Sequence, residues 1–118
     1  MVITLTLPWP PSVNHYFGQK GNKTFITPAG LAFRKAVYIV SLPYQKTELY
    51  DKKLNLFISA YPPDNRVRDL DNIIKSLQDA LQYSLIYKND FQINDLHVRR
   101  MKDNKGCVIV EIDEFLDE

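Results

Sequence analysis

Residues 66–81 read RVRDLDNIIKSLQDAL, and the apolar residues in this stretch recur with the clearest helical spacing in the chain. At about 100° per residue they fall within an arc of roughly 120°, which is typical of a helix that packs one face against a core. The members of this stripe are Leu70, Ile73, Ile74, Leu77, Ala80 and Leu81. The stretch therefore predicts a helix from Asp69 to Tyr83, with Asp69 as the N-cap and Asp71 in the first turn.

The segments on either side of this helix predict strands and one further helix. Alternating apolar residues favour strands at 1–7, 53–61, 96–101 and 107–112, with a short strand at 23–27. Thr27 followed by Pro28 is a typical helix start, and Pro43 is expected to end that helix. We expect the last two long strands to pair as a hairpin across the turn at 103–106.

Residues 7–22, LPWPPSVNHYFGQKGN, are predicted to form a loop, because three prolines and two glycines interrupt regular structure. The order of strands and helices predicts the fold class α/β (α+β): a mixed β-sheet with two main helices packed on one side. The chain has 118 residues and no repeat or linker, so a single domain spanning 1–118 is expected.

Composition excludes several classes of protein. Hydrophobic residues make up 45% and charged residues 25% of the chain, which is ordinary for a globular domain and unlike a disordered segment. No apolar run approaches the ~18 residues that cross a bilayer, so no membrane association is expected. The single cysteine, Cys107, cannot form an internal disulfide, and a reducing cytoplasm is the expected compartment.

The net charge of +1 conceals an uneven distribution. Residues 111–118 (EIDEFLDE), expected to be an acidic C-terminal tail, hold five acids; the remaining residues hold fifteen bases and nine acids, a balance of +6. Several bases cluster at Arg66, Arg68, Arg99, Arg100, Lys102 and Lys105. A basic body attracts polyanions, although an ordinary solvated surface explains charge of this size equally well.

Acidic side chains at the start of the 69–83 helix carry the predicted chemistry. Asp69 and Asp71 lie at the helix start, Lys75 follows on the same face as Asp71, and Asp90 lies in an irregular segment after the helix. Taken singly, each has a bland explanation, because acids are common at helix starts. Brought together, three carboxylates repel one another unless a cation neutralises them. Oxygen ligands favour Mg²⁺, with Mn²⁺ as a substitute, and bases such as Arg68 nearby would hold phosphates for phosphodiester hydrolysis.

Three segments together resemble the RusA-type Holliday junction resolvases, small endodeoxyribonucleases often carried by phages and prophages. They are LPWPPSVNHY at 7–16, RDLDN with the lysine that follows it at 68–75, and NDFQIND at 89–95. The resemblance covers nearly the whole chain, and the RDLDN segment with its trailing lysine is its most specific part.

The resemblance implies a homodimer that cuts four-way DNA junctions by paired symmetric nicks in DNA recombination and repair, with Mg²⁺ as cofactor. It matches the essential acids of the family to Asp69, Asp71 and Asp90, as catalytic residues and metal ligands. It matches the catalytically important lysine to Lys75 and a neighbouring arginine to Arg68. The residues expected to bind DNA are Arg66, Arg68, Asn14, Arg99 and Arg100.

The sequence departs from the family pattern at two places. Asn89 stands where a member of the family has the first of two adjacent aspartates, and Val67 interrupts the basic run between Arg66 and Arg68.

Two other functions stay open: a non-catalytic DNA-binding module, and a Mg²⁺ nuclease that acts on RNA or unbranched DNA.

The symmetry of the expected substrate favours a dimer. A four-way junction needs two cuts related by a two-fold axis, and one domain with one acid cluster supplies a single cut, so an isologous homodimer is predicted. Residues available for its interface are Tyr38, Tyr44, Tyr50, Leu85, Ile86, Tyr87 and Phe91.

Overall fold

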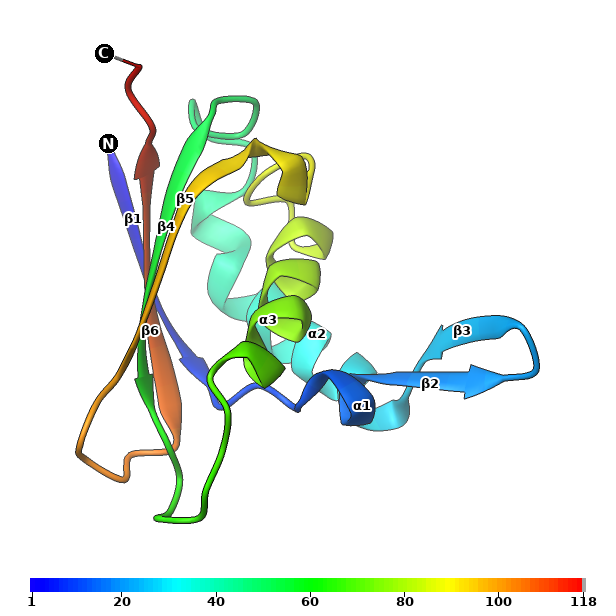
Figure 1. Ribbon diagram of the computed structural model, residues 1–118. Helices are drawn as coiled ribbons and strands as arrows, with labels where there is room; N and C mark the ends of the chain where they lie inside the picture. Colours follow the sequence, from blue (N-terminus) through cyan, green and yellow to red (C-terminus); the bar gives the residue numbers. More distant parts are fainter. Residues whose placement is uncertain (118) are drawn as a thin grey trace.

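The chain folds into a mixed four-stranded sheet with the helices on one of its faces (Figure 1). The structure is a computed structural model and describes residues 1–117. The sheet has the order β1-β6-β4-β5 and comprises β1 (Val2–Pro8), β4 (Leu54–Tyr61), β5 (Ile93–Arg100) and β6 (Cys107–Glu114). The helices are α1 (Val13–Tyr16), α2 (Pro28–Ser41) and α3 (Asp71–Tyr83), with short 3₁₀ turns at Leu42–Tyr44 and Asp90–Gln92. The predicted fold class is confirmed.

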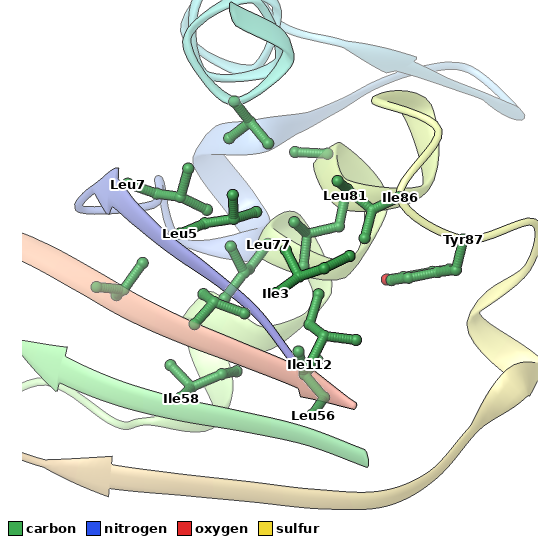
Figure 2. Close-up of a cluster of buried hydrophobic side chains, with 14 of the residues drawn as sticks. Ile3, Leu5, Leu7, Leu56, Ile58, Leu77, Leu81, Ile86, Tyr87 and Ile112 are labelled. Carbon is green, nitrogen blue, oxygen red and sulfur yellow. The ribbon is translucent and has the colours of Figure 1, made fainter. Parts of the chain in front are cut away.

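Alternation along the strands builds the core. In β1 and β4 every second side chain is buried, and these side chains meet the apolar stripe of α3 (Figure 2). Ile3, Leu56 and Ile58 from the strands and Leu77 from α3 are each at most 1% exposed. Burying a side chain of this size stabilises the fold by about 1.5–3 kcal/mol, so this face of α3 fixes the orientation of its opposite, polar face.

The predicted hairpin of the last two strands is wrong. β4 lies between them, pairing parallel with β5 and antiparallel with β6. The even-numbered side chains of β4 from Leu54 to Ala60 are all buried against the helices, and the backbone of β4 is paired along both edges. A turn between two sequence segments does not reveal which third strand is inserted between them.

The predicted loop at 7–22 is wrong in part. The prolines do keep residues 9–12 irregular, but α1 and β2 (Phe17–Lys20) follow them, and β2 pairs with β3 (Lys23–Ile26) as a separate two-stranded sheet. The glycines serve this hairpin: Gly21 takes a φ of 61° in its tight turn, which side chains disfavour. The strand predicted at 23–27 is confirmed as β3.

The predicted N-cap is confirmed for α2 and wrong for α3. Thr27 caps α2 as expected, its side-chain oxygen accepting a hydrogen bond of 3.0 Å from the Gly30 amide. In α3, by contrast, the N-cap is Leu70 and no side chain caps the helix, so the predicted capping role of Asp69 is wrong. Leu70 already has helical backbone angles, and the Asn72 amide bonds the Asp69 carbonyl instead of its carboxylate. Both acids at this helix end are thereby left free of a structural bond to the helix.

The acidic segment at 111–118 is only partly a tail. Its first four residues are the end of β6, with Ile112 only 1% exposed in the core, and Glu118 lies outside the described residues. No helix in the described part of the chain is long and apolar enough to span a membrane.

Candidate nuclease site

A cavity of about 480 Å³ lies between the proline-rich segment and the start of α3. Trp9 and His15 line it from the N-terminal segment, and Arg66, Arg68 and Asp69 line it from the segment before α3. The Ser76 hydroxyl, buried on α3, donates a hydrogen bond of 2.6 Å to the Pro11 carbonyl. This bond fastens the proline-rich wall of the cavity to α3.

Arginines are arranged around the segment that leads into α3. The Arg68 guanidinium bonds Asp64 at 2.5 Å, and Arg66 lies 3.2 Å from the same carboxylate. The hydrogen bond from Arg68, followed by that from the Arg66 amide, holds the pKa of Asp64 well below its usual range. Asp64 therefore stays charged and fixes the direction of both guanidinium groups.

Arg100 extends this basic surface from the sheet. Its guanidinium donates a hydrogen bond of 2.5 Å to the Arg68 carbonyl. A second cavity, of about 410 Å³, is lined by Arg66, Arg68, Arg100 and Lys102 and adjoins the first through the two arginines that they share. The structure thus brings together three of the five residues predicted to bind DNA, next to Asp69.

Two of the three predicted acids lie at the start of α3, and the third, Asp90, lies in the 3₁₀ turn Asp90–Gln92 beside a later part of that helix. Asp69 and Asp71 are exposed at the beginning of α3, and Lys75 is exposed one turn further on. The Asp90 carboxylate lies 2.9 Å from the Tyr87 hydroxyl, which also lies 2.8 Å from the Gln78 carbonyl. Since Gln78 follows Asp71 by seven residues, its carbonyl lies about 10 Å further along the helix axis.

Tyr87 fixes Asp90 in this position. Burial, followed by the nearby charge of Asp90, raises the pKa of Tyr87 well above its usual value. The hydroxyl therefore remains a hydrogen-bond donor. The Asp90 amide also donates to the Gln82 side chain at 3.1 Å, so backbone and carboxylate are both tied to α3.

The oxygen atoms of the predicted acids are suitable ligands for a hard cation, but the three acids do not form one cluster. Asp69 and Asp71 supply oxygen ligands, and one or two carboxylates are what Mg²⁺ usually takes from a protein, with water and phosphate completing its shell. Within residues 1–117, no three histidine, cysteine or acidic side chains are grouped so that they could share one ion. The start of α3 therefore offers two exposed carboxylates, those of Asp69 and Asp71, whose oxygen atoms are ligands suited to a hard cation.

Two predicted DNA-binding residues lie outside the cavities. Asn14 is exposed on α1, next in the chain to His15 in the wall of the first cavity. Arg99 lies on the opposite face of the sheet from the helices, with its guanidinium 5.5 Å from the centre of the Phe57 ring. Neighbouring residues of a strand point to opposite faces, so Arg99 and Arg100 cannot both reach one surface.

Sequence reasoning missed the residues that position the site. Asp64 had a local signal, because it precedes Arg66 and Arg68 by two and four residues. Tyr87 and Ser76 had none, since their partners Gln78, Asp90 and Pro11 are placed by tertiary packing.

This α+β domain, with exposed carboxylates at a helix start and arginines around an adjoining cavity, has the features of a nuclease that binds a polyanionic backbone. Comparison with known families agrees. The family model described as Endodeoxyribonuclease RusA matches residues 8–113. The chain belongs to the RusA family of endodeoxyribonucleases, which confirms both the resemblance and the expectation of an enzyme.

Curated relatives support the same assignment. The chain is 37% identical over 111 residues to "Crossover junction endodeoxyribonuclease rusA" of Enterobacteria phage HK97, covering 92% of each chain. It is 35% identical over 107 residues to the enzyme of that name from Escherichia coli (strain K12), covering 87% of this chain and 86% of the relative. It is 34% identical over 102 residues to the one from Enterobacteria phage 82, covering 86% and 85%. Two of these relatives come from bacteriophages, in line with the expected phage or prophage connection.

Proposed function

We propose that this chain is a Mg²⁺-dependent, structure-selective endodeoxyribonuclease that resolves four-way DNA junctions in recombination and repair. The relatives named as crossover junction endodeoxyribonucleases support this substrate. The observation that carries the proposal is the cavity that places Asp69 beside Arg66 and Arg68. Phosphodiester cleavage needs acids for a hard cation and bases for the phosphates side by side.

The basic residues of the site have distinct roles in this proposal. Arg68 and Arg100, linked through the Arg68 carbonyl, hold phosphates on the strand to be cut, and Asp64 keeps Arg68 aimed. Fixed donors of this kind stabilise developing charge without reorganising first. Lys75, on the same face of α3 as Asp71, supplies a positive charge to the phosphate being cleaved.

The acidic residues hold the metal. Asp69 and Asp71 would hold Mg²⁺, or Mn²⁺ in its place, at the start of α3. The ion, when bound, supplies Lewis-acid stabilisation of the charge that develops on the phosphate. Asp90 is proposed as the third essential acid because of the family resemblance. The Tyr87 hydroxyl orients the Asp90 carboxylate through a hydrogen bond.

The same proposal includes assembly and compartment. Two chains related by a two-fold axis would place two such sites on the two equivalent strands of a junction. A DNA substrate and a lone cysteine support the cytoplasm as the place of action.

The decisive experiment compares Asp71→Asn with the wild-type protein on a synthetic four-way junction, with linear duplex, single-stranded DNA and RNA as controls. The wild-type protein should cut the four-way junction and none of the control substrates, and it should do so only when Mg²⁺ or Mn²⁺ is present. Asp71→Asn keeps the shape of the side chain but removes a negative ligand. We expect its cleavage rate to fall at least 100-fold while junction binding is retained or tightened, because repulsion from the phosphates decreases.

Three outcomes would contradict the proposal. Junction binding with no cleavage under any metal condition favours the non-catalytic DNA-binding module. Equal cleavage of RNA or linear duplex favours the less selective nuclease. Normal cutting by Asp71→Asn, or by wild type in excess EDTA, shows that the acids at the start of α3 do not serve catalysis.

A further inference from the structure

The hairpin formed by β2 and β3, residues 17–26, is an arm that projects from the body of the protein (Figure 1). Its two strands pair only with each other, and its tip is the turn at Gly21 and Asn22. At about 3.3 Å per residue, strands of four residues extend roughly 13 Å. None of the residues predicted to bind DNA or metal lies on this arm.

The arm is braced along its length and at its root. The Phe25 ring covers Gly18 on the facing strand so closely that a side-chain carbon at Gly18 would collide with the ring. At the root, the Thr27 amide bonds the Tyr16 carbonyl at 3.0 Å, and Gly30 allows the helix to approach that same carbonyl. An isolated two-stranded hairpin is only marginally stable in water, so these contacts hold the arm in one direction.

The tip of the arm carries uncompensated positive charge. Lys20 and Lys23 lie directly opposite each other in the register, and residues 17–26 contain no acid. Both lysines are exposed, and neither takes part in an ion pair within residues 1–117. Like charges placed opposite one another destabilise a hairpin. A polyanion at the tip would remove this repulsion.

The arm begins beside the cavity that Asp69 lines. It follows α1 directly, and His15 of α1 lines the cavity that contains Asp69. Hydrogen-bonding side chains at Gln19, Asn22 and Thr24 accompany the two lysines, and such groups are common partners of DNA phosphates. A DNA strand seated in the cavity would continue past its edge, on the side where the arm leaves the body.

We propose that the β2–β3 arm is a second DNA contact, which holds the phosphate backbone of a duplex next to the strand being cut. This inference rests on the proposed function, because it assumes that DNA occupies the cavity. The arm adds affinity without touching the reacting phosphate, so it acts on binding and leaves the chemical step unchanged.

The test replaces both lysines by glutamine, Lys20→Gln with Lys23→Gln, and measures junction binding without Mg²⁺ between 50 and 200 mM salt. Each lost phosphate contact lowers the slope of log affinity against log salt by about 0.9, so the slope should become shallower by roughly 2. Affinity should fall roughly tenfold or more at 0.1 M salt. The single-turnover cleavage rate at saturating protein should remain within about twofold of wild type, because the reacting groups are intact.

A matched control separates position from bulk charge. Lys46→Gln with Lys52→Gln removes the same number of charges from exposed residues in the connection before β4, which lies at the top of the view in Figure 1, away from the arm. This variant should keep the wild-type slope. Thermal unfolding of both variants checks the fold, and the arm variant should melt no lower than wild type because it loses a repulsion.

The results distinguish failure of the arm from failure of the proposed function. A wild-type protein that neither binds nor cuts junctions overturns the proposed function itself. Wild-type cutting together with an unchanged slope in the arm variant overturns the arm contact alone. A smaller particle mass of the arm variant in light scattering, with the slope unchanged, shows that the arm binds a second copy of the chain and also overturns it.

Discussion

At the scale of single residues, the direction of a side chain decides its role more than its charge does. Arg99 and Arg100 are adjacent in sequence and equally basic, but they point to opposite faces of the sheet. Arg100 bonds the Arg68 carbonyl at the basic cavity, whereas Arg99 lies over the Phe57 ring on the face without helices. The two arginines therefore make a natural matched pair for mutation.

We expect Arg100→Ala to weaken junction binding and to make its salt slope shallower by about 1, which corresponds to one phosphate contact. Arg99→Ala should change the affinity by less than about twofold, since its guanidinium faces away from the cavities. Fluorescence anisotropy with a labelled junction, titrated at several salt concentrations, measures both. Equal losses in the two variants would show that DNA also covers the open face of the sheet.

At the scale of elements, a polar cluster locks the three helices together beneath the root of the arm. The Tyr16 hydroxyl on α1 bonds Asp79 on α3, and Arg34 on α2 donates to the same carboxylate at 2.8 and 3.0 Å. Burial, followed by the hydrogen bond to Asp79, raises the pKa of Tyr16 well above its usual value. The cluster therefore depends on a protonated tyrosine.

This dependence has a definite sign. Below about pH 10 the hydroxyl is protonated in both the folded and the unfolded chain. Above that pH the unfolded chain loses the proton first, so the free energy of unfolding should fall as pH rises. Tyr16→Phe should lower this free energy by about 1 kcal/mol at pH 7 and flatten its decline between pH 9 and 11. Urea unfolding at each pH measures it.

Tyr38→Phe is the control for this prediction, because Tyr38 is an exposed tyrosine on α2. Its decline above pH 10 should match that of the wild-type protein. An equally steep decline in Tyr16→Phe would mean that Tyr16 ionises as easily folded as unfolded.

At the scale of the whole molecule, the apolar residues expected at a dimer interface differ in exposure, and Tyr44, Tyr50 and Leu85 are half-buried. Ile86 and Tyr87 are at most 1% exposed and belong to the core, so they are unavailable to a partner. Phe91 is 89% exposed and Tyr38 is 37% exposed, and both remain available. Exposed residues that sequence reasoning did not select, Leu31 and Tyr83, lie close to Tyr38 around one shallow hollow on α2 and α3.

We expect a homodimer of twice 13.8 kDa in solution, because a junction presents two equivalent strands and each chain carries one site. Light scattering at micromolar concentration gives the mass. On a cruciform plasmid, paired cutting within one binding event should yield linear product directly. A 13.8 kDa particle that leaves mostly nicked circles would contradict the dimer.

Local patterns were sufficient for much of this protein. The stripe from Ile73 to Leu81, the start of α2 at Thr27 and Pro28, and the alternation of β4 depend on neighbours within one helical turn or one strand, and all three predictions are confirmed. The family was also recognisable from short segments such as RDLDN, because the residues of each segment are adjacent in the chain.

Tertiary structure decided everything that depends on distant partners. Inserting β4 between β5 and β6 is a competition among edges for backbone hydrogen bonds, and no local pattern encodes its outcome. The position of Asp90 against α3 depends on Tyr87, which reaches Gln78 only once the core has formed. Arg99 and Arg100 lie on different surfaces because the helices cover only one face of the sheet, and the sequence does not reveal which face that is. Local patterns thus supplied the candidate site residues, and long-range packing determined which of them meet.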